Sequence, residues 1–521
     1  MLGPGEHPDK HSPSAGGAKW RPGHAVLSCP VSRPALGNSP VAIRFQRSTT
    51  VALIVACALF MENLDGTVIA TALPQIANSM GVEPVRLSLA ITSYLLSVAI
   101  FIPASGWAAD RFGTRTIFRA AIAVFAFGSI LCGISGDVWQ LTGARIVQGM
   151  GGAMMVPVGR LVLLRNVEKS DLVRAMALVT MPAMIGPVFG PPVGGFIVTY
   201  ASWRWIFFLN IPIAILGFVL VSLLIENEKA ADTPPLDVWG YVLAGTTLSG
   251  MVMGFETIGR DGVPLPAALA ILGLGAAAAL LYVRHARRHP HPIVDLTLFR
   301  IPTFAIAIAG GTLFRIGIGA LPFLLPLMFQ VGFGMTALAS GMLTFVSAIG
   351  AFAMKLSARP ILRLLGFRTV LIANGILSAL FLMCYGAFDI STPNSVILLL
   401  LLTGGFFRSL QFTATNALVF ADVPLQRMSK ATSISATAQQ LSQSVGIATG
   451  ASILHLMLTS RGSATLAASD FLPAFLVVGL ISAVSSVVFT RLARNAGSAL
   501  RGRRPQPIPA SAEERRKAAA D

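Results

Sequence analysis

The chain has 521 residues, of which 54% are hydrophobic and only 12% carry a charge. A soluble protein has about twice that share of charged residues, and soluble domains of this total size would need more polar surface than the chain supplies. The composition therefore excludes a soluble enzyme and indicates a polytopic α-helical membrane protein. Its apolar segments run for about 20 residues without alternation, which also excludes a barrel of alternating β-strands.

Fourteen apolar runs are long enough to cross a bilayer as helices. In chain order they cover residues 50–72, 88–108, 116–135, 140–163, 173–199, 204–224, 238–257, 264–284, 303–331, 337–357, 368–388, 395–420, 434–457 and 470–491. We therefore predict an all-α membrane fold with 14 transmembrane helices.

The basic residues are distributed unequally between the loops. The loops after even-numbered spans hold 18 Lys and Arg, those after odd-numbered spans hold 4, and both tails are basic. Because short cytoplasmic loops carry the excess of Lys and Arg, this asymmetry predicts that both termini and the even-numbered loops are cytoplasmic. It also accounts for the net charge of +17 without a nucleic-acid partner.

The two ends of the chain differ from the rest. Residues 1–48 are rich in Pro, Gly and Ser, and residues 492–521 in Arg, Ala and Pro, so we expect two disordered basic cytoplasmic tails. The four cysteines are spaced for neither a disulfide framework nor a metal site. We expect no metal and no cofactor.

Three ionisable side chains within the spans are the leading functional candidates, Glu62, Asp65 and Arg145. A charge near the bilayer centre costs about 2.5 to 3.5 kcal/mol on insertion scales, so one that is kept there points to a function. Glu62 and Asp65 are three residues apart on one helix face, where repulsion and burial would leave at least one of them able to hold a proton. We predict a proton-carrying carboxyl pair that Arg145 switches by approaching and leaving.

Arg315, Arg408 and Glu256 are also placed within spans, where a structural ion pair is the alternative to a function. A substrate cavity is expected to be lined by polar side chains of the later spans, namely Arg315, Gln330, Arg408, Gln411, Asn416, Gln439 and Gln440. Glutamines in a membrane bundle serve about as often to join neighbouring helices, and that alternative stays open.

Prolines and glycines interrupt the fifth span. The positions Gly186, Pro187, Gly190, Gly194 and Gly195 belong to a segment that would kink or break an isolated helix. Such a segment survives where neighbouring helices pack closely on it. We expect a close-packing seam that seals a pathway and serves as a pivot.

The loop between spans 2 and 3 carries Asp110, Arg111, Gly113 and Arg115. Asp110 is suited to cap a helix or pair with a basic residue, Gly113 permits a tight turn, and the arginines hold the loop in the cytoplasm. We predict a gating loop.

Part of this loop recurs between spans 10 and 11. Gly366 and Arg368 match Gly113 and Arg115, whereas Arg363 meets Asp110. Arg145 and Arg408 each lie one span beyond their loop. The repeat predicts two related six-helix halves, 49–225 and 303–491, separated by two inserted helices within 226–302. Parallel halves of this kind enclose a midplane site and rock against each other.

Six segments match one family in order. They are 64–74, 106–115, 145–152, 186–195, 203–212 and 321–330. On these the chain resembles the major facilitator superfamily, specifically the fourteen-span drug:proton antiporters of the EmrB/QacA type and, among those, the MdtD-like exporters. The resemblance implies the major facilitator fold. It implies that Asp65 belongs to the span 1 motif, Asp110 and Arg115 to the gating loop, Arg145 to the proton-coupling motif, and Gly186 with Pro187 to the antiporter motif.

We therefore expect a proton-coupled antiporter of the plasma (inner) membrane that exports amphiphilic or cationic small molecules by alternating access. An exporter of one metabolite, lipid or siderophore is one alternative, and a non-transporting membrane sensor is another. The expected partners are protons, a small molecule and the lipid bilayer, with the chain a monomer and a periplasmic adaptor left open as a further partner. A membrane-embedded enzyme is excluded, because no cluster of nucleophile, base or metal ligands falls within the spans.

Overall fold

The computed structural model describes residues 40–497 apart from 168–171, 231, 232, 234, 258–262, 291, 425, 426, 463 and 464. The two expected disordered tails therefore lie largely outside the described residues. The chain divides into Met1–Arg44 and Phe45–Asp521, and the following description concerns the second unit.

The described residues form helices and their connections. The first half contains α1 (Pro40–Met80), α2 (Ser88–Phe112), α3 (Thr114–Ile134), α4 (Val138–Asn166), α5 (Leu172–Tyr200), α6 (Trp205–Phe208) and α7 (Asn210–Leu224). The inserted pair is α8 (Val238–Thr257) and α9 (Leu265–Ala286). The second half contains α10 (Pro302–Gly319), α11 (Leu321–Leu327), η3 (Met328–Gly332), α12 (Ala337–Leu365), α13 (Phe367–Tyr385), α14 (Asn394–Val419), α15 (Met428–Arg461) and α16 (Phe471–Phe489).

Thirteen stretches of the described residues are long and apolar enough to cross a membrane. They coincide with thirteen of the predicted spans, and the 29-residue helix α5 occupies the remaining predicted position. The all-α membrane fold expected from the sequence is confirmed.

Two predicted spans are interrupted, and prolines explain both interruptions. Leu209 separates α6 from α7, and Pro212 follows three residues later. Pro322 lies just after the break between α10 and α11, and Pro326 precedes the π-helical turn η3. Proline has no N–H to donate and its ring clashes with the carbonyl four residues earlier, so a regular helix ends or widens at such places.

Small residues let the helices approach closely, as is usual in membrane bundles. A Cβ added to Gly128 of α3 would lie 2.6 Å from the backbone of Gln148 in α4, and one added to Gly151 of α4 would lie 2.5 Å from the Phe125 nitrogen of α3. The α3–α4 contact therefore fixes the position of the helix that carries Arg145.

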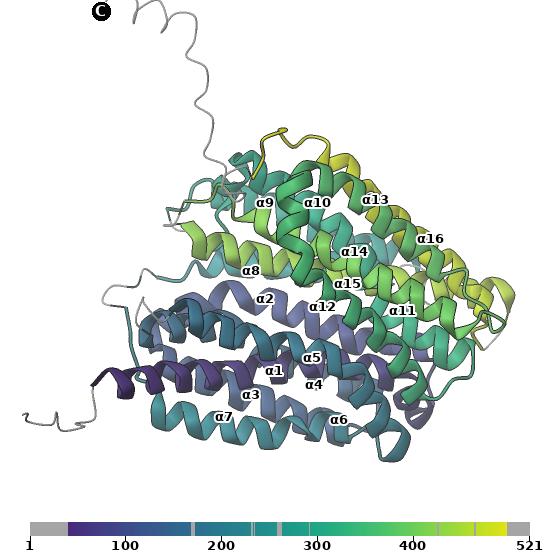
Figure 1. Cartoon of the computed structure of the whole chain (residues 1–521), viewed down its shortest axis with the longest axis horizontal. Coiled ribbons are helices and arrows are strands. Elements are labelled where there is room, and N and C mark those ends of the chain that lie inside the picture. The colour runs from purple at the N-terminus through teal and green to yellow at the C-terminus, as the bar shows by residue number, and fades with distance from the viewer. Residues whose placement is uncertain are drawn as a thin grey trace, which may run out of the picture. The chain divides into compact units, whose positions relative to one another are not determined.

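The two halves meet through α5 with α12 and through α2 with α15 (Figure 1). The inserted helix α8 packs on both α2 and α15, beside that second contact. Gln75 donates to Gln330 over 2.9 Å, and Gln330 donates to the Thr71 carbonyl over 3.0 Å. The Leu338 amide donates to Thr199 over 3.3 Å. These bonds join the halves at the end where α1 and α5 finish and α12 begins, so the bundle is closed at that end.

Candidate functional site

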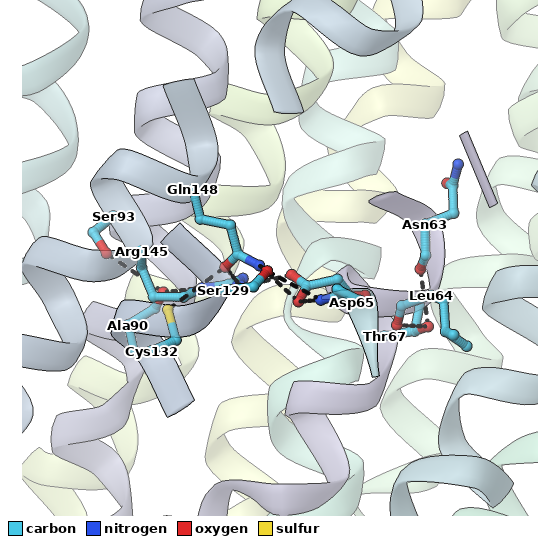
Figure 2. Close-up of polar contacts among 11 residues, drawn as sticks. Asn63, Leu64, Asp65, Thr67, Ala90, Ser93, Ser129, Cys132, Arg145 and Gln148 are labelled. Carbon is cyan, nitrogen blue, oxygen red and sulfur yellow. Dashed lines mark hydrogen bonds and ion pairs between the residues drawn. The ribbon is translucent and has the colours of Figure 1, made fainter. Parts of the chain in front are cut away.

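A buried ion pair lies at the centre of the first half. Arg145 Nη1 is 2.6 Å from Asp65 Oδ2, with the two side chains 0% and 2% exposed. The other oxygen, Oδ1, accepts hydrogen bonds from Gln148 (2.9 Å) and Asn210 (2.8 Å). Gln148 also donates to Ser129 over 2.7 Å. Figure 2 shows Asp65, Ser129, Arg145 and Gln148 pointing toward one another. A charged pair without water is tolerated when its remaining polar atoms are satisfied in this way.

Arg145 has further partners on its other side. Its Nε donates to the Ala90 carbonyl of α2 over 3.2 Å, and Nη1 also donates to Gln148 over 2.6 Å. The guanidinium carbon lies 4.1 Å from the centre of the Tyr94 ring, a cation–π contact that is strong where water is excluded. Nη2 has no hydrogen-bond partner among the described residues. The two N–H donors of Nη2 are thus left for a different arrangement.

Gln148 and Asn210 received no role from the sequence, although both stand in segments that carry the family resemblance. Gln148 follows Arg145 by one helical turn, so a second polar group on the same face was a readable signal. Asn210 begins α7, far from Asp65 in the chain, and only the packing of α7 shows that the two side chains meet.

Glu62 is not part of this network. It lies on α1 one turn before Asp65, is partly exposed, and its Oε2 is buried without a hydrogen-bond partner in the described part of the chain. The two carboxyl groups of the predicted pair therefore differ in their bonding partners. Asp65 is held in an ion pair, whereas Glu62 has a carboxyl oxygen without a hydrogen-bond partner among the described residues.

The glycines of the fifth span pack against this same stretch of α1. A Cβ added to Gly186 would lie 3.1 Å from the Leu64 nitrogen, and one added to Gly190 would collide with Thr67. Gly194 faces Thr71 in the same way. Gly195 instead faces Ala337 of α12, whose carbonyl would be 2.6 Å from an added Cβ. α5 remains one helix through Pro187 and fits closely between α1 and the second half.

The loop between α2 and α3 is held by residues that the sequence analysis did not single out. Asp110 Oδ1 is 2.5 Å from Arg165 Nη2 of α4. Gly113 has a φ of 98°, which favours glycine, and a Cβ there would collide with Asn227. Asn227 also accepts from the Thr116 amide over 3.2 Å. The segment after α7 therefore covers the loop. Of the predicted gating residues, Arg111 is exposed and Arg115 is partly exposed.

The expected cavity-lining residues fall into different environments. Gln411 is fully buried and joins Asn374 and the Leu371 carbonyl, each over 2.9 Å, so it connects helices. Gln330 joins the halves as described above. Gln439 and Gln440 are partly buried on α15.

Arg315 of α10 is 2% exposed and donates from Nη2 to Asn416 over 2.5 Å. Arg408 of α14 lines a small cavity with Ser378, Tyr385 and Ser482. Its Nη2 donates to Ser347 over 3.1 Å.

Glu256 of α8 is buried and accepts from two hydroxyl groups of α2. Ser88 donates to Oε1 over 2.8 Å, and Thr92 to Oε2 over 2.6 Å. This agrees with the structural interpretation of Glu256, since the contacts attach the inserted pair to the first half.

A further cluster lies where α8 begins and α9 ends. His285 Nε2 is 2.6 Å from Asp237 Oδ1, which also accepts from the Gly240 amide over 2.9 Å. The rings of His285 and His289 are stacked, with centroids 5.1 Å apart. Burial alone would raise the pKa of Asp237, but these hydrogen bonds and the two histidines hold that pKa below its ordinary value. Sequence analysis missed the cluster because 48 residues separate Asp237 from His285.

Comparison with known proteins agrees with this architecture. The sequence is 36% identical over 442 residues to the "Putative multidrug resistance protein MdtD" of Salmonella heidelberg (strain SL476), covering 84% of this chain and 94% of that protein. The same figures hold for the protein of that name from Salmonella typhimurium (strain LT2). The predicted resemblance to MdtD-like proteins is confirmed.

Two solved structures share the fold. A D-xylose–proton symporter superposes with a TM-score of 0.62 at 15% identity, over 86% of this chain and 98% of its own. The nucleoside transporter NupG gives a TM-score of 0.59 at 13% identity, over 84% of this chain and 98% of its own. At these identities the likeness concerns the fold alone.

The family model described as the Major Facilitator Superfamily matches residues 55–447. Together with the relatives this establishes a multi-pass secondary transporter and not an enzyme. The chain belongs to the Major Facilitator Superfamily.

Proposed function

We propose that this chain is a proton-coupled antiporter that exports amphiphilic small molecules by alternating access. The observation that carries the proposal is the ion pair of Asp65 with Arg145, buried in a membrane helix bundle and surrounded by neutral donors. A carboxylate kept in such a place serves a proton or ion pathway by default. The similarity to proteins named for multidrug resistance supports the amphiphilic cargo.

In the proposed cycle, the arrangement described here is the state that takes up cargo. The bundle is closed at the end where α1 and α5 finish, which is the extracellular end if both termini are cytoplasmic. In this proposed state Asp65 is paired with Arg145, and cargo would enter from the cytoplasmic side. Protonation from outside, after the halves have rocked, would weaken the pair and release the cargo outward.

The energy that a proton gradient supplies is comparable with the energy needed to break the buried ion pair. Removing one member of a buried ion pair costs about 3 to 5 kcal/mol. A proton entering under a membrane potential of 100 mV gains about 2.3 kcal/mol, and one pH unit adds about 1.4 kcal/mol. Because these terms together are comparable with the pair, protonation of Asp65 is feasible when a change of conformation or cargo contributes the remainder.

Glu62 has a separate role in this proposal. It lies one helical turn from Asp65 and has a carboxyl oxygen without a hydrogen-bond partner in the described part of the chain. We assign it to receive the proton first and pass it to Asp65. The glycines of α5 that pack on the same stretch of α1 would transmit the movement of this stretch to α12 and the second half.

The proposal places the chain in the inner membrane with both termini in the cytoplasm. A reporter fused after residue 521 tests this directly. Fluorescence of a C-terminal green fluorescent protein supports the orientation, whereas activity of a C-terminal alkaline phosphatase contradicts it.

The coupling is tested by the variant Asp65→Asn in inverted membrane vesicles. Wild-type vesicles are expected to release protons when an exported compound is added. Asp65→Asn should reduce this release at least 100-fold while the protein remains inserted, because an amide of the same shape cannot carry the proton. Glu62→Gln is expected to slow the release without abolishing it.

The variant Gly66→Ser serves as a matched control, since Gly66 lies on the same helix and an added Cβ there meets nothing within 4 Å. Gly66→Ser should release protons as the wild type does. Unchanged proton release by Asp65→Asn contradicts the proton-carrier role. The absence of any flux for the wild type favours the alternative of a non-transporting sensor.

A further inference from the structure

The sequence alone predicts an amphiphilic or cationic cargo, but the charges of the second half favour a different one. The helices α10 to α16 contain no Asp or Glu, yet Arg315 and Arg408 lie within their membrane-spanning stretches and Lys355 stands at the end of one. In the part of the chain that the structure describes, all three bind neutral partners and none forms an ion pair. A cation kept inside a membrane bundle marks a substrate or ion pathway.

Arg315 is the most deeply buried of the three. Only its Nη2 makes a hydrogen bond, to Asn416, and its Nε and Nη1 are buried without a partner among the described residues. The Phe412 ring lies 5.4 Å from the guanidinium carbon. A guanidinium has five N–H donors, and a buried donor without an acceptor is costly. The group is therefore incomplete unless an acceptor comes from outside the chain.

Arg408 and Lys355 are more accessible. Arg408 is partly exposed and faces a small cavity that also contains the hydroxyl groups of Ser378 and Tyr385. Lys355 of α12 is exposed, and its Nζ donates to Thr413 over 2.8 Å. Both cations are therefore less buried than Arg315.

All three cations contact or belong to one helix. Arg408 belongs to α14, Lys355 reaches Thr413 of α14, and Arg315 reaches Asn416 of α14. At 1.5 Å per residue, positions 408 to 416 lie within about 12 Å along the helix axis. Hydroxyl and amide groups lie among these cations, and they also bind an anion through donated hydrogen bonds.

We propose that the cargo carries an acidic group, such as a carboxylate or sulfonate, that binds the cations gathered on α14. This rests on the proposed export function and specifies its substrate class. An oxyanion supplies the acceptors that Arg315 lacks and a counter-charge for Arg408, and Arg matches a carboxylate in a bidentate geometry. A cationic cargo would instead bring a further positive charge to three that are already uncompensated.

Binding to the purified full-length protein tests the proposal without any gradient. Thermal stability is measured against matched compounds that differ in charge, namely decanoate and decylamine, 1-naphthylacetate and 1-naphthylmethylamine, and carboxyfluorescein and rhodamine 123. We expect the carboxylates to raise the melting temperature and the amines and rhodamine to leave it unchanged. Equal stabilisation by the cations, or none by any carboxylate, overturns the proposal.

Variants locate the site. Arg408→Gln is expected to weaken carboxylate binding at least tenfold, whereas Arg408→Lys, which keeps the charge, should lose less. Lys355→Gln is a second variant at an exposed position, so it is expected to fold even if Arg408→Gln does not. Arg363→Gln removes an exposed charge from the end of α12 and should bind as the wild type does. Equal losses for Arg363→Gln and Lys355→Gln contradict a local site.

The two proposals fail in different ways. Asp65→Asn should still bind carboxylates, although it no longer releases protons. If carboxylates bind but the wild type shows no proton-coupled flux, the export proposal fails and this one stands. If the wild type releases protons on addition of rhodamine 123 and binds no carboxylate, export stands and the acidic cargo is wrong.

Discussion

Both halves of the molecule hold an arginine near the middle of a membrane helix, but the surroundings of the two charges differ. Arg145 in the first half has Asp65 at 2.6 Å and a second acceptor in Gln148. Arg408 in the second half has the hydroxyl of Ser347 at 3.1 Å, and α10 to α16 provide no carboxylate. Arg145 therefore has its counter-charge beside it, whereas Arg408 has none in the part of the chain that the structure describes.

We infer from this difference that the two halves of the repeated fold have different functions, one binding the proton and the other the cargo. A network whose charges are balanced internally responds to a proton, because one proton on Asp65 unbalances it. A group of cations without counter-charges responds to an anion, because binding supplies the balance. Alternating access couples the two responses through α5, whose glycines pack on α1 and on α12.

The largest expected effect comes from removing Arg145. Arg145→Leu leaves Asp65 buried without its counter-charge, so the free energy of unfolding should fall by about 3 to 5 kcal/mol. Chemical or thermal unfolding of the purified protein measures this. The double variant Asp65→Asn with Arg145→Leu should recover most of the stability but none of the proton release. If the single variant is as stable as the wild type, the first half does not depend on the pair.

The matched change in the second half should have the opposite sign. Arg408→Leu removes a charge that has no counter-charge in the described part of the chain, so the unliganded protein should be unchanged or more stable. The same unfolding measurement, in the absence of carboxylates, gives the answer. A loss as large as that of Arg145→Leu would show that Arg408 is compensated after all, and the contrast between the halves would disappear.

The sequence predicted the helices well because each span is a long apolar run with its own boundary signals. It also identified Asp65 and Arg145, since charges inside such runs are rare. It did not identify Asn210 as a partner of Asp65, or Arg165 as a partner of Asp110. It also gave no role to Lys355. Lys355 in particular stands near the end of its span, where a basic residue is ordinary.

The packing adds detail to the repeat. Arg145 and Arg408 each lie one span beyond their loop, but they do not occupy equivalent positions. Ser97 of α2 donates to the Ile146 carbonyl, and Gly350 of α12, the same 16 residues before its loop glycine, packs on the Leu402 carbonyl. These contacts align Arg145 with Leu401, two turns away from Arg408. Sequence could not decide this because the connection before α14 is longer than the one before α4.

A change in α5 tests whether the two halves are coupled through its glycines. A Cβ at Gly190 collides with Thr67, so Gly190→Val should push α5 away from α1 at a cost of about 1 to 3 kcal/mol. Proton release should fall more than carboxylate binding, because the displaced contact belongs to the half that carries the ion pair. Gly66→Ala, where space is open, should change neither. A Gly190→Val protein with normal release would contradict the role of the seam.

The inserted helices provide the smallest test, the hydrogen-bonded Asp237 and His285. Asp237 accepts from Gly240 and His285, and its pKa lies below the ordinary value. A carboxyl whose pKa is lower in the folded state adds stability above its unfolded pKa of about 3.9, and this contribution disappears as the pH falls through the folded value. Asp237→Asn should therefore cost about 1 kcal/mol at pH 7 and nothing once the pH is below the folded pKa. Unfolding curves of both proteins at several pH values measure the difference. A cost that stays constant down to low pH would mean that the negative charge of Asp237 does not stabilise its contacts with His285 and Gly240. The argument that partnered charges stabilise this protein, on which the comparison of Arg145 with Arg408 rests, would then be weakened.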